Sequence, residues 1–571
     1  MSEAQFRPYE TDPCYAPATG RVRTGYPAAV ASVPSGSVVL AVDGPTAVRW
    51  DVVAAALSDA LSAAGRSVKF LDVREHYASW ELILQRTASP ELPDDPHFAT
   101  LSDVELPALL DDLPRPEVVP GGVVVVYGPG AALVDPDVLW YADLPKRYAE
   151  AAITGGDGRN LGQPTGTGPG TTRRLFYIDW PVLDRHRDAI ADRVALWLDT
   201  QDVDAPASLD GDALRATLAE LAARPFRTRP TFNTTSWGGH WGQDALGFNT
   251  QAANTALGYE LIAPESGILV GDAETAKVEV PFQLLVALHP EAVLGVDVHR
   301  AFGTSFPIRF DYLDTVGGGN LSVHCHPQSD YMRRVFGWPY TQHETYYVMV
   351  NGEDSRVFLG LRDGVDVEAF RRDADAAVHH GVPFDIERHV QSFPAEAHQL
   401  FLIPAGTPHG SGDGNVVLEI SATPYLYSLR FYDWLRKDAN GEQRPVHVGH
   451  AFDNLAVERT GQRVAVDLVQ RPRLLREVDG ATEDVIGSLP DMFFEVTRLE
   501  LGVGAVIEDT AGDRFHILNV VEGAGVVVET AAGHRHSLAY AETLTIPAAA
   551  GGYTVRAAGS TPVRVVKAFV K

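Results

Sequence analysis

The stretch LSVHCHP, residues 321–327, carries two histidines, His324 and His326, separated by one residue. Side chains at positions i and i+2 of a β-strand point to the same face. Both imidazoles can therefore bind one ion from a single strand. Cys325 points to the opposite face, and we expect it to pack in the core.

Two further candidate ligands follow along the chain. Glu344 lies in QHETYYV, residues 342–348, near the start of the next β-like run, and PAGTPH, residues 404–409, is a turn that delivers His409 from a hairpin. One such histidine alone is more often a core or surface residue, but the set in this order indicates a metal site. Three neutral nitrogens and one carboxylate suit zinc, manganese, iron or cobalt, and an open coordination position would accept a substrate oxygen. We expect these four residues to hold one divalent metal, with zinc as the first choice.

Short β-like runs separated by Gly, Pro and Asp-Gly turns surround these residues, and they predict an antiparallel sandwich or barrel. Residues 365–379 have helical character and interrupt the β pattern. The same β texture returns from about residue 441 and predicts a second barrel. The runs are 267–270, 320–324, 346–350, 400–403 and 416–420 in the first part, and 493–501, 516–521, 525–528, 542–546, 553–557 and 563–569 in the second.

The first 200 residues or so read differently, because apolar valine-rich runs alternate with helical patterns. Strands are expected at 38–42, 68–73 and 123–127, and helices at 51–64, 183–198 and 208–223. This order predicts a parallel α/β domain. We therefore expect a multidomain protein with an α/β domain over 1–205, a metal-binding barrel over 206–440 with a helical insert at about 361–398, and a C-terminal barrel over 441–571.

Composition sets further limits. With 571 residues, 45% hydrophobic and 21% charged, the chain has the balance of a globular protein of several domains. The formal net charge of −28 disfavours nucleic-acid binding but leaves room for a small anionic substrate in a locally positive pocket. Only two cysteines, no evident signal peptide over residues 1–9 and no apolar run of about 18 residues lead us to expect a cytoplasmic protein that does not enter a membrane.

The order His-x-His, Glu and Pro-x-Gly-x-x-His resembles the two motifs of the cupin superfamily, whose domains are jelly-roll barrels. Within it, the chain from about residue 226 to its end resembles class I mannose-6-phosphate isomerase. The stretches that carry the likeness are TSWGG at 235–239, LSVHCHP at 321–327, GLRDGV at 360–365, IPAGTPH at 403–409, LEIS at 418–421, LRFYDW at 429–434 and RPVH at 444–447. In combination these motifs are specific.

This resemblance implies a metal-dependent aldose–ketose isomerase that interconverts mannose 6-phosphate and fructose 6-phosphate through an ene-diol intermediate. Such a reaction needs charge stabilisation at two oxygens and an acid/base group that moves a proton. Arg430 matches the position that the resemblance marks as catalytic, and its fixed charge suits an oxyanion or a phosphate. Glu419 is a candidate base and Glu260 a weaker one. The alternative for Arg430 is a structural salt bridge, and the alternative for Glu419 and Glu260 is a buried structural carboxylate.

Two positions depart from the family. His324 stands where the family usually has Gln, which preserves a metal ligand, and Gln342 stands where it usually has Lys. His343 could cover part of that lysine's role. The missing lysine keeps a second hypothesis open, a cupin metalloenzyme that acts on a different or unphosphorylated sugar as an isomerase or an oxidoreductase.

The N-terminal segment resembles a nucleoside or uridine kinase over residues 39–50 and again over WYADLPKR, residues 140–147. A functional phosphate loop reads G-x-x-x-x-G-K-[ST]. Here Gly44 is followed at the matching positions by Arg49, Trp50 and Asp51. The resemblance therefore implies a kinase-like fold without kinase activity, serving as scaffold, contact in a homodimer, or sensor. A purely non-catalytic sensor is the third hypothesis for the whole chain.

The C-terminal segment lacks the ligand pattern. Its counterpart of the PAGTPH turn reads PAAAGGY, residues 547–553, without a histidine. His534 and His536 share the spacing of the histidine pair in the first barrel, but they lie in a predicted hairpin turn. We expect this barrel to be metal-free and structural.

For the protein as a whole, we expect the ligand to be a small phosphosugar.

Overall fold

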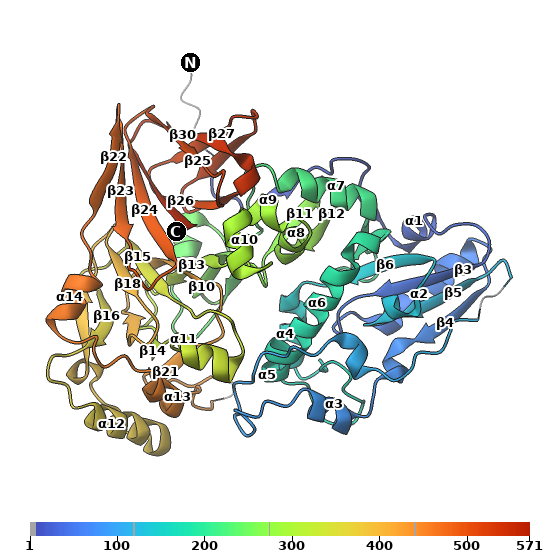
Figure 1. The fold of residues 1–571 in the computed structure, drawn as a ribbon, viewed down its shortest axis with the longest axis horizontal. Helices are drawn as coiled ribbons and strands as arrows, with labels where there is room; N and C mark the ends of the chain where they lie inside the picture. The colour runs from blue at the N-terminus through green and yellow to red at the C-terminus, as the bar shows by residue number, and fades with distance from the viewer. Residues whose placement is uncertain (1–6, 118–119, 273, 439–440) are drawn as a thin grey trace.

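The computed structural model describes residues 7–117, 120–272, 274–438 and 441–571. Most of the segment that bears on a signal peptide, residues 1–9, lies outside this description. An α/β unit occupies one side of the molecule and two β-barrels occupy the other, with a group of short helices between them (Figure 1). Among the described residues, none of the helices has the length and apolar character that a membrane crossing needs.

The α/β unit is built on a seven-stranded sheet with the order β2-β8-β7-β6-β3-β5-β4. Five neighbouring strands, from β7 to the edge strand β4, are parallel, and the valine-rich ones among them are buried as expected. The five are β3 (Val38–Asp43), β4 (Val68–Asp72), β5 (Val123–Tyr127), β6 (Val138–Asp143) and β7 (Leu196–Asp199). At the other edge, β2 (Arg23–Thr24) and β8 pair antiparallel. Helix α2 (Trp50–Ala63) follows β3, and it buries Trp50, Val53, Leu57 and Leu61.

Two expectations for this unit are wrong in detail. The helix expected over 183–198 ends at Ile190 in α6 (Trp180–Ile190), and residues 196–199 form β7 because this apolar stretch is buried between two strands. The boundary at residue 205 comes too early. Strand β8 (Ala207–Asp210) extends the sheet, and α7 (Gly211–Leu221) buries its apolar side against the unit.

The metal-binding barrel consists of two facing sheets, with the orders β18-β15-β20-β13-β10-β9 and β17-β16-β19-β14-β21. The helix of the insert is α12 (Val367–His380), between β16 (Arg356–Leu361) and β17 (Val390–Pro394). The remaining strands are β9 (Thr231–Asn233), β10 (Leu257–Leu261), β13 (Ile308–Asp314), β14 (Val323–Cys325), β15 (Glu344–Val350), β18 (Leu400–Ile403), β19 (His409–Ser411), β20 (Val416–Ala422) and β21 (Leu429–Tyr432). The run at 267–270 is β11 (Gly267–Gly271), which belongs to a separate small sheet with β1 (Cys14–Tyr15) and β12 (Lys277–Pro281).

The C-terminal barrel begins later than residue 441. Helix α13 (Val448–Asp453) packs on the first barrel beside β21, and the second barrel starts at β22 (Arg473–Val478). Its sheets have the orders β22-β23-β24-β31-β26-β29 and β25-β30-β27-β28, in which β23 is Ala481–Gly487, β25 is Val506–Thr510 and β28 is Arg535–Ala539. All six β-runs expected here are strands: β24 (Phe494–Leu501), β26 (His516–Glu522), β27 (Gly525–Thr530), β29 (Thr543–Ile546), β30 (Gly552–Ala558) and β31 (Val563–Val570).

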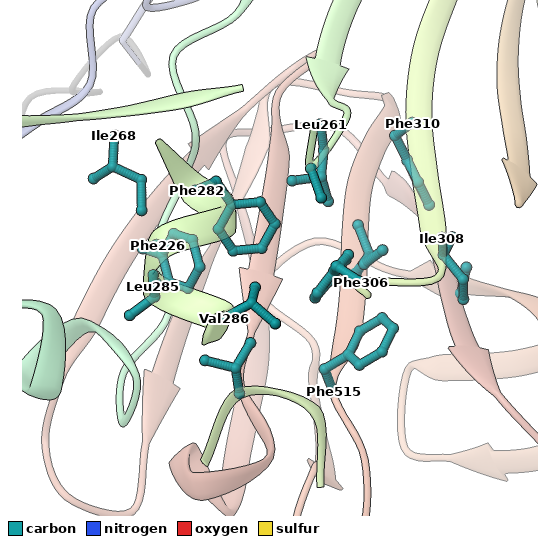
Figure 2. Packing of buried hydrophobic residues seen from close by; sticks show 14 of the residues in the cluster. Phe226, Leu261, Ile268, Phe282, Leu285, Val286, Phe306, Ile308, Phe310 and Phe515 are labelled. Atoms are coloured by element: carbon teal, nitrogen blue, oxygen red, sulfur yellow. The ribbon is translucent and has the colours of Figure 1, made fainter. Parts of the chain in front are cut away.

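One apolar core joins the three parts. Helix α8 (Phe282–Leu288) presents Phe282 to Phe226 on one side and to Phe306 on the other, with ring centroids 5.6 and 4.9 Å apart. Phe306 then contacts Phe515 of the C-terminal barrel at 4.2 Å. Figure 2 shows Phe226, Phe282, Phe306 and Phe515 close together among the buried apolar side chains. This shared core fixes the α/β unit against the barrel that carries the candidate site.

Candidate metal centre

Three histidines meet inside the first barrel. His324 on β14 lies directly opposite His409 on β19, and His326 follows at the end of β14. All three are buried, and one ligand nitrogen from each lies within 4.8 Å of the others. Cys325, between the two histidines of β14, faces the apolar cluster on the other side of the strand. The alternation of a strand therefore brings the three imidazoles together as the sequence predicts.

Backbone carbonyls orient the three rings. The Nδ1 atom lies 2.9 Å from Ser322 O in His324, 3.3 Å from Tyr427 O in His326, and 2.9 Å from Thr407 O in His409. A carbonyl oxygen only accepts, so Nδ1 carries the proton in His324 and His409, and their Nε2 atoms present a lone pair. His326 Nε2 lies beside the Glu344 carboxylate and presents its lone pair when a cation takes the place of the proton between them. Burial and the neighbouring rings hold the pKa of His324 well below its usual value, which keeps that ring neutral. Neutral imidazoles held through the far nitrogen are the form in which histidine binds a metal.

Glu344 on β15 completes the group from the facing sheet. Its Oε2 lies 2.7 Å from His326 Nε2, and its Oε1 lies 3.4 Å from His409 Nε2. Oε1 of Glu344 and Nε2 of His409 are buried without a hydrogen bond among the described residues. Buried polar atoms are rarely left in this state, and a divalent cation would bind both. The donor set therefore fits a metal of the zinc class.

His324, His326 and Glu344 line a cavity of about 230 Å³, and His409 lies buried directly behind them. Trp237 and Leu321 form part of its wall. The TSWGG segment reaches this place because Gly239 packs tightly on the barrel, where a Cβ would lie 2.2 Å from Asp314 Oδ1 and 2.5 Å from Val316 N. Only glycine fits there.

A second group of charges lies in the same cavity. On β13 and β20, Asp311 pairs with Glu419, and Arg309 pairs with Ser421, which in turn pairs with Glu344. Arg309 donates from Nε to Ser421 Oγ at 2.6 Å, hydrogen-bonds Glu419 through Nη2, and lies 3.4 Å from Asp311 Oδ1. One guanidinium thus serves two carboxyl groups.

Two buried carboxyl groups beside one arginine do not both ionise easily. Burial raises the pKa of Asp311 to about 6, and burial likewise raises the pKa of Glu419 well above its usual value despite the nearby Arg309. Both oxygens of Asp311 lack a hydrogen bond among the described residues. Raised pKa values let a carboxyl group of this cluster take up and release a proton, which is what acid/base catalysis requires.

Arg430 on β21 pairs with His324 across the strands and also lines the cavity. Its Nη1 donates to Pro445 O at 3.0 Å, while its Nε is buried without a partner among the described residues. Burial and the nearby Arg444 lower the pKa of Arg430 to about 10. The group stays charged at neutral pH and is poised for an anion.

Two other candidates lie outside the cavity. Glu260 accepts hydrogen bonds from the hydroxyl of Tyr9 and from Thr543 N, at the contact with the C-terminal barrel. His343 accepts from Ala405 N at 3.2 Å and does not line the cavity, so it cannot stand in for the family's lysine. Gln342 does line it, and its Nε2 donates to Glu344 Oε2 at 2.8 Å.

The sequence reasoning missed Arg309 and Asp311, although a signal was present. Strand β13 reads IRFDYLD, in which two charged residues alternate with buried apolar ones. Charges on one face of a fully buried strand must face each other or a ligand.

In comparisons with known proteins, the N-terminal unit matches one family, and about half of the chain matches a group of enzymes. Residues 25–223 match the family described as "Domain of unknown function (DUF8485)". The chain is 24% identical over 291 residues to mannose-6-phosphate isomerase of Streptococcus mutans, covering 51% of this chain and 83% of the relative. It is also 24% identical over 283 residues to the probable mannose-6-phosphate isomerase GmuF of Bacillus subtilis, covering 48% and 80%.

Solved structures of the same kind are similar as well. Mannose 6-phosphate isomerase from Bacillus subtilis matches with a TM-score of 0.48 and 19% identity, covering 60% of this chain and 99% of that one. A zinc-bound mannose 6-phosphate isomerase matches with a TM-score of 0.45 and 15% identity, covering 61% and 100%. About half of the chain is thus similar in sequence to mannose-6-phosphate isomerases.

Proposed function

We propose that this protein is a metal-dependent isomerase that interconverts mannose 6-phosphate and fructose 6-phosphate. The observation that carries the proposal is the convergence of three buried imidazoles and the Glu344 carboxylate, of which His324, His326 and Glu344 line an accessible cavity. Sequence similarity to mannose-6-phosphate isomerases over about half of the chain supports it. The substrate would be a small phosphosugar.

His324, His326, Glu344 and His409 would hold one divalent cation, zinc in the first place, with manganese, iron or cobalt as alternatives. When bound, this cation supplies Lewis-acid stabilisation of negative charge on the sugar oxygens. The chain's own groups perform the remaining work in this proposal.

Glu419 and Asp311 are the candidates for the proton transfer between C2 and C1. Both lie on one face of the cavity, and Arg309 holds Glu419 in place. A deprotonated carboxyl group at this position can take the C2 proton and return it to C1. The fixed charge of Arg430, on the opposite sheet, would stabilise the developing ene-diolate or the phosphate.

An exchange assay tests the proposal. Purified protein is supplied with fructose 6-phosphate, and formation of mannose 6-phosphate is followed with and without a chelator. Activity that is lost on chelation and restored by a divalent cation supports the proposal. The variant His326→Ala should lose both metal and activity. His389→Ala is the matched control, because His389 is also buried but binds Asp373 outside the cavity. Full activity in His326→Ala would contradict the assignment.

A second function is favoured by one observation, the neutral Gln342 beside Glu344. A cupin metalloenzyme that isomerises or oxidises a different or unphosphorylated sugar would not need the lysine that the family carries here. Protein that binds metal, turns over mannose and does not turn over any phosphosugar would favour this alternative.

For the N-terminal unit we propose a kinase-like domain without kinase activity, located in the cytoplasm with the rest of the chain. The free thiols of Cys14 and Cys325 are consistent with that location. The loop after β3 leads into α2. Asp43, at the end of β3, accepts hydrogen bonds from three backbone amides and pairs with His186, so its carboxylate is fully engaged within the domain. Calorimetry with ATP should show no binding, and tight binding would overturn this proposal. A homodimer through this unit is testable by light scattering.

A further inference from the structure

A second cavity lies where the α/β unit meets the metal-binding barrel. It has a volume of about 400 Å³. Its walls are residues 96–98, 172–173 and 176–177 of the α/β unit and residues 425, 426, 428, 430, 445 and 447 of the barrel. Tyr425, Ser428 and Arg430 line both this cavity and the metal cavity, so the two adjoin.

The walls of this cavity are held in a fixed position. Across the contact, Leu101 N donates to Phe336 O at 2.8 Å and the Tyr177 hydroxyl donates to Leu426 O at 3.2 Å. Phe98 lies 5.3 Å from the ring of Phe336, and both belong to one buried cluster with residues of the barrel. The α/β unit therefore forms a wall beside the metal cavity.

Two guanidinium groups line this cavity. Arg173 donates from Nε to Phe98 O at 2.6 Å and from Nη2 to Leu92 O at 3.1 Å, which leaves Nη1 without a partner among the described residues. Arg430 binds a carbonyl oxygen, and its buried Nε lacks a partner in the described part of the chain. Both guanidinium groups are thus bound to carbonyl oxygens, in a chain with a net charge of −28.

His97 adds a ring that no hydrogen bond holds within the described residues. Its backbone amide binds Asp95, while its ring packs edge-on against His447, with centroids 5.3 Å apart. Asp95 and Glu265, the nearby carboxylates, bind His450 and Tyr425 and do not line this cavity. Burial lowers the pKa of His97, so its ring is a neutral N–H donor. Two guanidinium groups without a carboxylate partner, together with this neutral donor, indicate a site for an anion.

We propose that this cavity takes the phosphate group of the sugar substrate, and that Arg173 and His97 of the α/β unit bind it together with Arg430 of the barrel. The α/β unit is then a part of the substrate site and not only a scaffold. This inference rests on the proposed isomerase function, because a phosphosugar would place its phosphate here and its C1–C2 end at the metal.

Two substitutions in the α/β unit test it. Arg173→Met removes a charge, and His97→Gln removes a ring that makes no hydrogen bond. Arg66→Met is the matched control, because Arg66 also binds two carbonyl oxygens, of Pro34 and Gly36, on the exposed surface of the same unit. The readouts are KM and kcat for mannose 6-phosphate, the inhibition constant of inorganic phosphate, and phosphate binding to the metal-loaded protein by calorimetry.

Loss of a charge-assisted hydrogen bond should raise KM and the inhibition constant of phosphate about tenfold or more, while kcat changes by no more than about twofold. Arg66→Met should change neither constant. Unchanged constants in both variants, or an equal change in the control, would overturn the inference. If Arg173→Met does not fold, His97→Gln decides the question alone.

Calorimetry separates this inference from the proposed function. Phosphate binding that depends on Arg173 in a protein without isomerase activity would leave the anion site in place and remove the proposed function. Isomerase activity together with phosphate binding that is unaffected by both variants would keep the proposed function and remove the anion site.

Discussion

The metal-binding barrel and the C-terminal barrel are both built from a six-stranded and a smaller sheet, yet different groups fill them. The first holds Glu344, His409 and Asp311 with polar atoms that no described residue satisfies. The second holds an apolar cluster of Leu, Ile, Val and Ala side chains, including Leu518 and Val528.

The charged groups of the C-terminal barrel are paired. Lys567 Nζ lies 2.7 Å from Glu483 Oε1 and 2.5 Å from Asp509 Oδ2. The turn that carries His409 in the first barrel has a counterpart that leads to Tyr553, whose hydroxyl binds His516 at 2.8 Å. In the described part of this barrel, Arg498 Nε, Asn519 Oδ1 and His536 Nε2 are buried without a partner, but no three His, Cys, Asp or Glu side chains come together as a candidate metal site there. In the first barrel the unsatisfied atoms of Glu344 and Asp311 lie in one cavity, and this concentration indicates a ligand.

The largest loss of activity is expected for a metal donor, because the two barrels differ most at the metal site. His409→Ala removes a metal donor and should lower kcat/KM at least about 10³-fold, because the charge stabilisation that the cation supplies is worth several kcal/mol. Tyr553→Phe, at the matching place in the other barrel, should leave kcat/KM unchanged. Steady-state kinetics with metal analysis measures both, and comparable losses in the two variants would remove the distinction between the barrels.

A smaller loss is expected for the carboxyl pair. Glu419→Gln removes a candidate base and should lower kcat about 10²- to 10⁴-fold with metal retained. In the unmodified protein, kcat/KM should rise with pH through the raised pKa of the pair, about 6 for Asp311, because only the deprotonated base accepts the C2 proton. A pH profile measures this limb. A variant that keeps its activity and the limb would exclude Glu419 as the base.

A third change tests the paired charges. Lys567→Met leaves Glu483 and Asp509 with Arg476 as their remaining cation, at 2.6 and 3.4 Å. Loss of the two charged hydrogen bonds of Lys567 should lower the free energy of unfolding by about 1.5–3 kcal/mol. Burial raises the pKa of Glu483, but Lys567 outweighs it and holds that pKa below its usual value. The stabilisation is therefore present at neutral pH and is lost as the pH falls through the lowered pKa. Lys571→Met, at the end of the chain, is the control, and urea unfolding at pH 7 and pH 4 gives the difference.

The smallest effect, a modest loss of metal affinity, is expected for a residue next to the metal donor His324. Ser322→Ala removes a hydroxyl 3.3 Å from His324 Nδ1 but keeps the carbonyl that orients the ring. Metal affinity should fall by less than about tenfold. Competition with a chromogenic chelator measures it, and a loss as large as that of His409→Ala would show that the hydroxyl, not the carbonyl, positions the ring.

Much of the site could be predicted from sequence because local periodicity determines it. The i and i+2 spacing of His324 and His326 brings both rings to one face, and the same rule predicts that His343, between Gln342 and Glu344, turns away from the cavity. Applying this rule to β13 would also have found Arg309 and Asp311.

Other features leave no local signal. The contact of Phe98 and Tyr177 with the barrel joins residues far apart in sequence, and such packing has no period to read. The end of α6 at Ile190 was missed because the apolar residues of β7 continue a helical pattern until tertiary burial turns them into a strand.

The central claim is that three imidazoles and one carboxylate bind a single cation. X-ray absorption at the zinc edge of the zinc-loaded protein tests it most directly. We expect a shell of nitrogen and oxygen at about 2.0–2.1 Å with the scattering pattern of three imidazoles. A sulfur shell at about 2.3 Å, or zinc that exchanges freely with the buffer, would contradict it.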